Sequence, residues 1–177
     1  MSGQMWCLSH RADPAAKRLA DRHYNRQKPD SAQFVPPGRC VVLLSVDGTA
    51  FWVSSWPYGE YVRHAWPGAW VCSAFRNEGS ALASELILGA LAATRAVFGD
   101  PPALGMITFI DRAKVRPTVV RSAPMWGWTY WKAGFSVAGE TAGGLLAMQI
   151  MPADMPPALA ALPRSMIGLP LFDGAAA

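Results

Sequence analysis

The chain has 177 residues, of which 51% are hydrophobic and 16% charged, so it holds enough apolar material for one folded domain and lacks the composition of a disordered protein. Its apolar runs end before the ~18 residues of a membrane span, and MSGQMWCLSHRADP lacks the apolar centre of a signal peptide. Three widely spaced cysteines without a CxxC pair predict ordinary buried thiols rather than disulfides or structural zinc. A cytoplasmic protein without a membrane partner is expected.

The first half of the chain predicts one helix followed by three strands. Asp13 and Pro14 form a helix start, with aspartate as the N-cap, so a short helix is expected over residues 15–24. Asp47-Gly48 between two β-rich segments predicts a hairpin. The predicted strands are residues 40–46, 49–55 and 69–75, with loops rich in Pro, Gly or aromatic residues over 27–39 and 56–68.

The second half predicts a long helix and a further set of strands. Apolar residues at three-to-four spacing predict the helix, which opens after a glycine loop and stops at Gly99. A buried strand should follow and end in Asp111, and a basic, irregular stretch comes next. The remaining expected elements are a helical turn within 124–135, a hairpin of 135–139 with 144–151, a short helix within 152–163 and a tail. The fold class is mixed α/β with one crossover helix.

The glycine loop before the long helix has a composition that suits a bound anion. Helix N-termini present free backbone N–H groups and a partial positive charge. The spacing Arg76-x-x-Gly79-x-Ala81 resembles the R/Q-x-x-G-x-G/A pyrophosphate loop of the GNAT acyltransferase superfamily, which cradles coenzyme A, although a plain glycine turn is the alternative. The resemblance implies acetyl-CoA as cofactor, bound by Phe75, Arg76, Asn77, Glu78, Gly79, Ser80 and Ala81. Glu78 could instead cap the helix.

A second segment, Tyr130-Trp131-Lys132-Ala133-Gly134-Phe135, resembles the Y-x-x-x-G-F segment near the end of GNAT domains. In that superfamily the tyrosine often protonates the leaving thiolate, a role that the resemblance gives to Tyr130. Together the two segments imply a GNAT-like domain over 1–177, with a mostly antiparallel central sheet flanked by helices. Its core would span about 14–151, followed by the C-terminal short helix and tail, 152–177.

Residues Ala20 to Arg26, the Arg-Asn-Glu-Gly loop and GMITFID followed by basic residues resemble the Mom family of phage DNA-modification proteins. Members have a GNAT-like fold, convert adenine in DNA to an N6-acetamido (carbamoylmethyl) form and protect DNA from restriction. The resemblance implies a bacterial host cell and double-stranded DNA with a flipped base as partner. The DNA-binding candidates form two basic clusters, Arg22, Arg26 and Lys28, and Arg112, Lys114 and Arg116. Scattered solvated charge is the alternative.

The catalytic candidates are His23, Tyr24, Asp111 and Tyr130. His23 could act as a general base or metal ligand, or form a structural hydrogen bond from the helix. Tyr24 could face the base, and Asp111 could orient a base or pair with Arg112. Two tryptophan-rich segments, around Trp56–Trp66 and Trp126–Trp131, could stack a flipped base or simply pack.

Two other functions stay open at this point. One is a GNAT N-acetyltransferase acting on a small or protein amine, and the other is a GNAT-like DNA-binding protein without catalysis. No ligand spacing defines a metal site, so the metal requirement stays open. The oligomeric state is likewise open, with a homodimer as one option.

Overall fold

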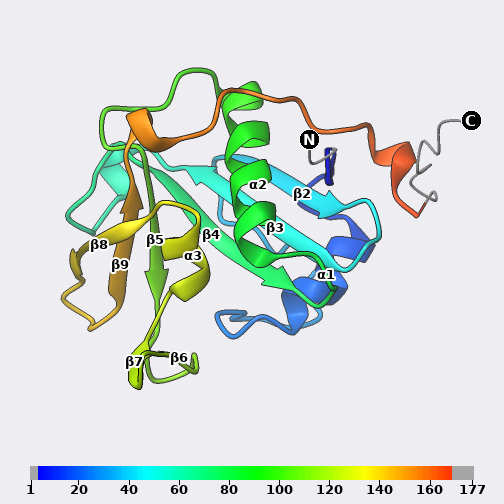
Figure 1. The fold of residues 1–177 in the computed structure, drawn as a ribbon. Coiled ribbons are helices and arrows are strands. Elements are labelled where there is room, and N and C mark those ends of the chain that lie inside the picture. The colour runs from blue at the N-terminus through cyan, green and yellow to red at the C-terminus, as the bar shows by residue number, and fades with distance from the viewer. Residues whose placement is uncertain (1–3, 169–177) are drawn as a thin grey trace, which may run out of the picture.

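A twisted seven-stranded sheet forms the centre of the computed structural model, which describes residues 4–168 (Figure 1). The strand order is β1-β2-β3-β4-β5-β9-β8, and neighbours are antiparallel except for the parallel pair β4 and β5. The expected mixed, mostly antiparallel sheet is therefore confirmed. Its strands are β1 (Trp6–Leu8), β2 (Arg39–Ser45), β3 (Ala50–Trp56), β4 (Trp70–Asn77), β5 (Met106–Ile110), β8 (Ser136–Glu140) and β9 (Leu146–Ile150).

Helices cover both faces of the sheet, because consecutive residues of a strand point to opposite sides. Val42 and Leu44 of β2 pack with Leu19 of α1 (Pro14–Asp21). Val41 and Leu43 pack into the other core, which contains the long helix α2 (Ala83–Phe98) and residues beside the short helix α3 (Trp128–Lys132). The three-residue 3₁₀ turns are η1 (Gly59–Tyr61), η2 (Pro152–Asp154) and η3 (Arg164–Met166).

The parallel strands β4 and β5 stay together for only a short distance. They pair from Trp70 with Met106 to Cys72 with Thr108. Beyond that point β4 continues along β3, and a bulge at Ser73 shifts its register. Strand β5 instead continues along β9. The two strands therefore diverge in the middle of the sheet.

Several predicted boundaries are confirmed and one is wrong. The Asp13 carboxylate accepts a hydrogen bond from the Ala15 N–H and caps α1, and Gly99 ends α2. The β2–β3 hairpin turns at Asp47-Gly48. However, α1 ends at Asp21 rather than Tyr24, because the N–H groups of Arg22 and His23 bond back to the carbonyls of Leu19 and Ala20 in a tight final turn. His23 is therefore not part of a helix.

Three short segments differ from the sequence-based prediction. Strand β1 was not expected, and the stretch 112–123, expected to be irregular, carries most of a small hairpin of β6 (Thr118–Val120) and β7 (Ala123–Met125). Within 152–163 the helix is limited to the single turn η2; further along, Leu162 exchanges two backbone hydrogen bonds with β1. Prolines in this segment interrupt helix and favour an extended chain. The predicted tail lies partly in residues 169–177, outside the described residues.

No helix within residues 4–168 has the length and apolar character needed to cross a membrane.

Candidate active site

The divergence of β4 and β5 opens a cavity of about 310 Å³. One wall comes from residues 72–76 of β4 and the opposite wall from residues 108–110 at the end of β5. Residues 127–130, at the start of α3, form the third side, and residues 23–25 lie at the fourth. A gap between parallel strands inside a sheet is suited to hold an extended ligand, because strand backbone groups that have lost their sheet partner face it. We call this cavity the central cleft.

Tyr130 projects into the central cleft from α3. Its hydroxyl lies 3.5 Å from the Cys72 thiol, and its ring packs edge-on against Phe75 and Phe135. Burial holds the pKa of Tyr130 well above its usual value and raises the pKa of Cys72 to about 12. At neutral pH Tyr130 is therefore a protonated phenol that can donate a hydrogen bond or a proton, and Cys72 is not a thiolate nucleophile.

Gly127 explains why α3 lies so close to the sheet. Its φ is +71°, and a Cβ atom there would lie 2.1 Å from the Met148 sulfur and 2.7 Å from Ile110 Cδ1. Only glycine permits both the backbone conformation and the close approach. Tyr130 is thus positioned by the packing of α3 on β5 and β9.

Residues 23–25 bridge the two diverging strands. The Asn25 side-chain N–H donates to the Ser73 carbonyl on β4 at 2.9 Å, while the Tyr24 hydroxyl donates to the Phe109 carbonyl on β5 at 3.2 Å. The Asn25 side-chain oxygen is hydrogen-bonded to His23 Nδ1. Asn25 was missed by the sequence analysis, and its adjacency to the predicted His-Tyr pair is the signal that could have found it.

The His23 ring lies half-buried against the rings of Tyr24 and Phe51. Burial lowers the pKa of His23, and the hydrogen bond with Asn25 opposes this effect without reversing it. The ring is therefore neutral at pH 7 and has one nitrogen able to accept a proton. Burial also raises the pKa of Tyr24, so its phenol stays protonated.

Asp111 lies outside the central cleft and does not form the suggested pair with Arg112. Its carboxylate accepts the Ala113 N–H at 3.0 Å and lies 3.7 Å from the Lys114 ammonium, so it opens the turn that follows β5. Arg112 points to the β8–β9 hairpin, where it pairs with Glu140 at 2.6 Å. Asp111 lines a neighbouring surface cavity together with Tyr24 and Asn25.

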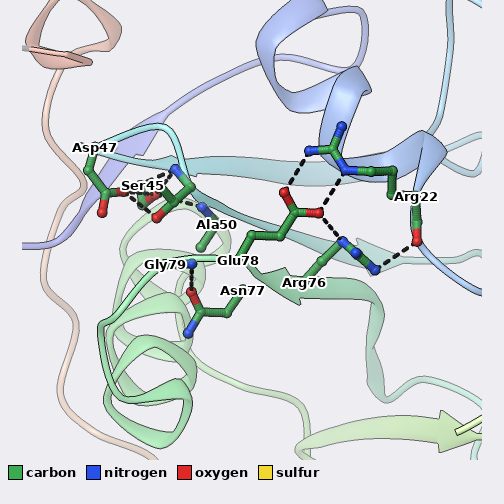
Figure 2. A network of polar contacts seen from close by, with 9 residues as sticks. Arg22, Ser45, Asp47, Ala50, Arg76, Asn77, Glu78 and Gly79 are labelled. Atoms are coloured by element: carbon green, nitrogen blue, oxygen red, sulfur yellow. Dashed lines mark hydrogen bonds and ion pairs between the residues drawn. The ribbon is translucent and has the colours of Figure 1, made fainter.

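The loop after β4 carries a dense ion-pair network at the surface, shown in Figure 2. The Glu78 carboxylate accepts two hydrogen bonds of 2.7 Å from Arg22 and one of 2.6 Å from Arg76. Arg76 also donates to the Arg22 carbonyl at 2.7 Å. Hydrogen bonds from these two arginines, the larger contribution coming from Arg22, lower the pKa of Glu78 to about 2. Glu78 therefore does not cap α2; the N-cap of α2 is Leu82, whose side chain makes no capping bond.

Two backbone N–H groups of this loop already form hydrogen bonds within the protein. The Glu78 N–H donates to the Thr49 carbonyl, and the Gly79 N–H donates to the Asn77 side chain, both at 2.9 Å. A Cβ at Gly79 would lie 2.2 Å from the Thr49 hydroxyl oxygen, so the β2–β3 hairpin requires the glycine. The next three N–H groups donate to no other described residue and lie before the start of α2; they belong to Ser80, Ala81 and Leu82.

The fold brings one residue of each predicted basic cluster, Arg26 and Lys114, to the same surface cavity, and carboxylates pair with most of the six cations. Arg22 pairs with Glu78, and Arg26 pairs with Asp21 at 2.8 Å. Together with the pairs of Arg112 and Lys114, four of the six predicted DNA-binding cations face a carboxylate. Within residues 4–168, Lys28 and Arg116 have no ion pair, and Arg116 lines the central cleft. The combined basic face is weaker than the sequence suggests.

The aromatic residues divide between core and surface. Trp56 packs edge-on against Trp70 in the core rather than in an open loop. Trp128 and Trp131 stack on each other with ring centres 5.0 Å apart. Among residues 4–168, no three His, Cys, Asp or Glu side chains gather closely enough to hold a metal ion.

No family model and no curated protein matches this sequence. Solved structures do match its fold. The aminoglycoside 6'-N-acetyltransferase from Enterococcus faecium and an aminoglycoside 6'-acetyltransferase of type Ii have TM-scores of 0.52 and 0.53. Each covers 86% of this chain and 98% of its own at 15% identity. The resemblance to Mom proteins gains no support from these matches and stays a prediction. The chain thus has the fold of the GNAT acetyltransferases.

Proposed function

We propose that this protein is an acyl-CoA-dependent transferase that acetylates an amine. The observation that carries this proposal is the buried, protonated Tyr130 hydroxyl inside a cleft between two diverging parallel strands. A leaving thiolate needs a proton donor, and this phenol is one that remains protonated at neutral pH. The fold of two acetyltransferases supports the same assignment.

In this reaction, residues on the two sides of the cleft have different roles. Acetyl-CoA supplies the activated acetyl group, and the free N–H groups before α2 would hold its phosphates. The acceptor amine attacks the thioester carbonyl, so that a C–N bond forms and the C–S bond breaks. Tyr130 gives its proton to the departing sulfur. His23, neutral at pH 7, accepts the proton that the amine loses, directly or through water.

Adenine modification in DNA, as the Mom resemblance implies, is a narrower form of this proposal. It requires a basic surface, and most of the predicted cations have carboxylate partners. An acetyl transfer to a smaller amine needs no such surface and therefore accounts better for the charges. Mass spectrometry of nucleosides from plasmid DNA in bacteria expressing the chain would reveal a modified adenosine if DNA is the acceptor.

The direct test replaces Tyr130 by phenylalanine and measures coenzyme A release from acetyl-CoA with a panel of amines. Loss of the hydroxyl should reduce turnover about 10²-fold to 10³-fold while leaving coenzyme A affinity in calorimetry unchanged. Tyr61→Phe is the matched control, since Tyr61 is 75% exposed and remote from the cleft lining. Equal turnover of both variants would remove Tyr130 from the mechanism, and a chain that binds coenzyme A without any turnover would favour a non-catalytic role.

The cofactor loop has its own test. Arg76→Ala should weaken coenzyme A binding by roughly tenfold in isothermal titration, since it removes a positive charge that lines the cleft and leaves the Glu78 carboxylate with one cation fewer. Arg18→Ala removes the same charge from the exposed side of α1 and should leave the affinity unchanged. Equal affinities for the two variants would contradict the assignment of the loop.

A further inference from the structure

A second cavity, of about 590 Å³, adjoins the central cleft on the α1 side of the sheet. Ser31 and residues 33–37 of the loop between α1 and β2 form part of its wall, and the fully buried Phe51 of β3 lies behind it. The two cavities share four lining residues, His23, Asn25, Ser73 and Ala74. A molecule in the second cavity therefore lies next to the histidine and to the β4 bulge that face the cleft. We call it the acceptor cavity.

The lining of the acceptor cavity combines an aromatic and proline-rich part with polar and cationic side chains. Phe34 and Phe51 meet edge to face with ring centres 6.1 Å apart, and Pro36 and Pro37 lie beside them. The His23 ring also meets Phe51 edge-on, at 6.2 Å. Aromatic rings and prolines offer broad surfaces to a planar ligand and hold few hydrogen-bonding groups for a flexible polar one.

The charges around both cavities have one sign. Among the described residues, no Asp or Glu lines the acceptor cavity or the central cleft. The cations are Arg26 and Lys28 in the former and Arg76 and Arg116 in the latter. Asp21 and Glu78 neutralise Arg26 and Arg76, which leaves Lys28 and Arg116 without an ion pair in residues 4–168. Asp111 is in the separate surface cavity, near Lys114.

We propose that the acceptor is a planar, weakly basic amine, an aryl or heteroaryl amine with an anionic substituent, and not a polycation. This inference rests on the proposed acetyl transfer. An alkylammonium group would lose hydration on entering these cavities without gaining a carboxylate partner. An aryl amine is uncharged at neutral pH, can pack its ring against Phe34 and the neighbouring prolines and can direct its anion to Lys28 or Arg116.

The test compares binding of two probes that differ in the charge of the amine and in one methylene group. 4-Aminobenzoate carries an uncharged amine at pH 7, whereas 4-(aminomethyl)benzoate carries the same ring and carboxylate with an ammonium group. Titration followed by NMR on the protein without coenzyme A should show the first binding at least about tenfold tighter. Because no cofactor is present, the result stands apart from whether the protein binds coenzyme A or transfers an acetyl group.

Reversing the charge of Lys28 tests whether this lysine binds the anionic substituent. Lys28→Glu should weaken 4-aminobenzoate binding by roughly fivefold to tenfold, since it replaces the attraction with repulsion. Lys132→Glu changes the net charge equally but lies outside both cavity linings, so it should leave the affinity within about twofold. Both lysines are exposed, which favours folding of either variant, and melting temperature checks this.

Each possible result of these titrations either supports or overturns the proposed acceptor class. Tighter binding of 4-aminobenzoate than of 4-(aminomethyl)benzoate, with an affinity that is weakened in Lys28→Glu but kept in Lys132→Glu, would support the proposal. Equal or tighter binding of 4-(aminomethyl)benzoate or of a polycationic aminoglycoside would overturn it. No binding of 4-aminobenzoate at millimolar concentration, or equal loss in both lysine variants, would also overturn it. Coenzyme A release with a polycation alone would confirm the acetyl transfer while refuting this acceptor class.

Discussion

The two sides of the central cleft are built in different ways. On the α3 side, Tyr130 is held by close packing, since α3 lies against Met148 and Ile110 with no room for a side chain at Gly127. On the α1 side, residues 23–25 are held by two hydrogen bonds to backbone carbonyls of diverging strands. Packing fixes the proposed proton donor, and hydrogen bonds fix the proposed acceptor side. The two sides should therefore respond differently to mutation.

The largest difference is expected from adding one methyl group to each side. Gly127→Ala must both strain a φ of +71° and overlap Met148 and Ile110, so it should destabilise the fold by about 2–4 kcal/mol. Gly38→Ala, in the loop on the α1 side, strains a φ of +106° but meets no atom within 4 Å, and about 1 kcal/mol is expected. Urea denaturation measures both values. Equal losses would show that packing does not distinguish the two sides.

The next largest effect concerns the contribution of Asp13, the N-cap of α1, to the stability of the fold. Asp13 is fully buried; burial raises the pKa of its carboxyl, but hydrogen bonds from Arg164, Ser9 and Ala15 outweigh this and lower the pKa to about 2. Because this pKa is below the unfolded value near 3.8, the carboxylate contributes stability above about pH 4 that is lost as the pH falls toward 2.

Asp13→Asn should therefore cost about 2 kcal/mol at pH 7 and much less at pH 2, because asparagine keeps the oxygen that caps the helix but loses the charge and the oxygen that accepts from Ser9 and Arg164 Nε, and at pH 2 the wild-type carboxyl is itself largely uncharged. Denaturation at several pH values provides the measurement. Asp100→Asn, whose side chain is 99% exposed, should change stability by less than about 0.5 kcal/mol at either pH. A loss for Asp13→Asn that does not vary with pH would contradict the charge-based explanation.

The smallest effect should appear in the pH dependence of kcat/KM, to which His23 on the α1 side contributes. Burial lowers the pKa of His23, so the acid limb of kcat/KM should fall below pH 6.5 if neutral His23 accepts the proton. Asn25→Ala removes a hydrogen bond that raises this pKa, so the limb should move to still lower pH. A limb at or above pH 6.5, or one that is unchanged in His23→Gln, would exclude His23 as the base.

Local signals in the sequence predicted much of the fold. Asp13-Pro14 starts a helix, Asp47-Gly48 turns a hairpin and Gly99 stops α2, because each depends on backbone preferences of neighbouring residues. The short strands β1, β6 and β7 were missed, since three residues carry too little periodicity. The helix expected through Tyr24 was too long because nothing local marks its end.

The sequence by itself determined the longer helices and strands, the glycine loop before α2 and the presence of Tyr130 in the second half of the chain. Only the tertiary structure decided where β4 and β5 diverge, that Tyr24 and Asn25 bridge them, and which cations face carboxylates. These features join residues that are far apart in the chain, such as Arg22 and Glu78. Strand pairing and ion pairing depend on which partners the folded chain brings together, and no local spacing encodes that choice.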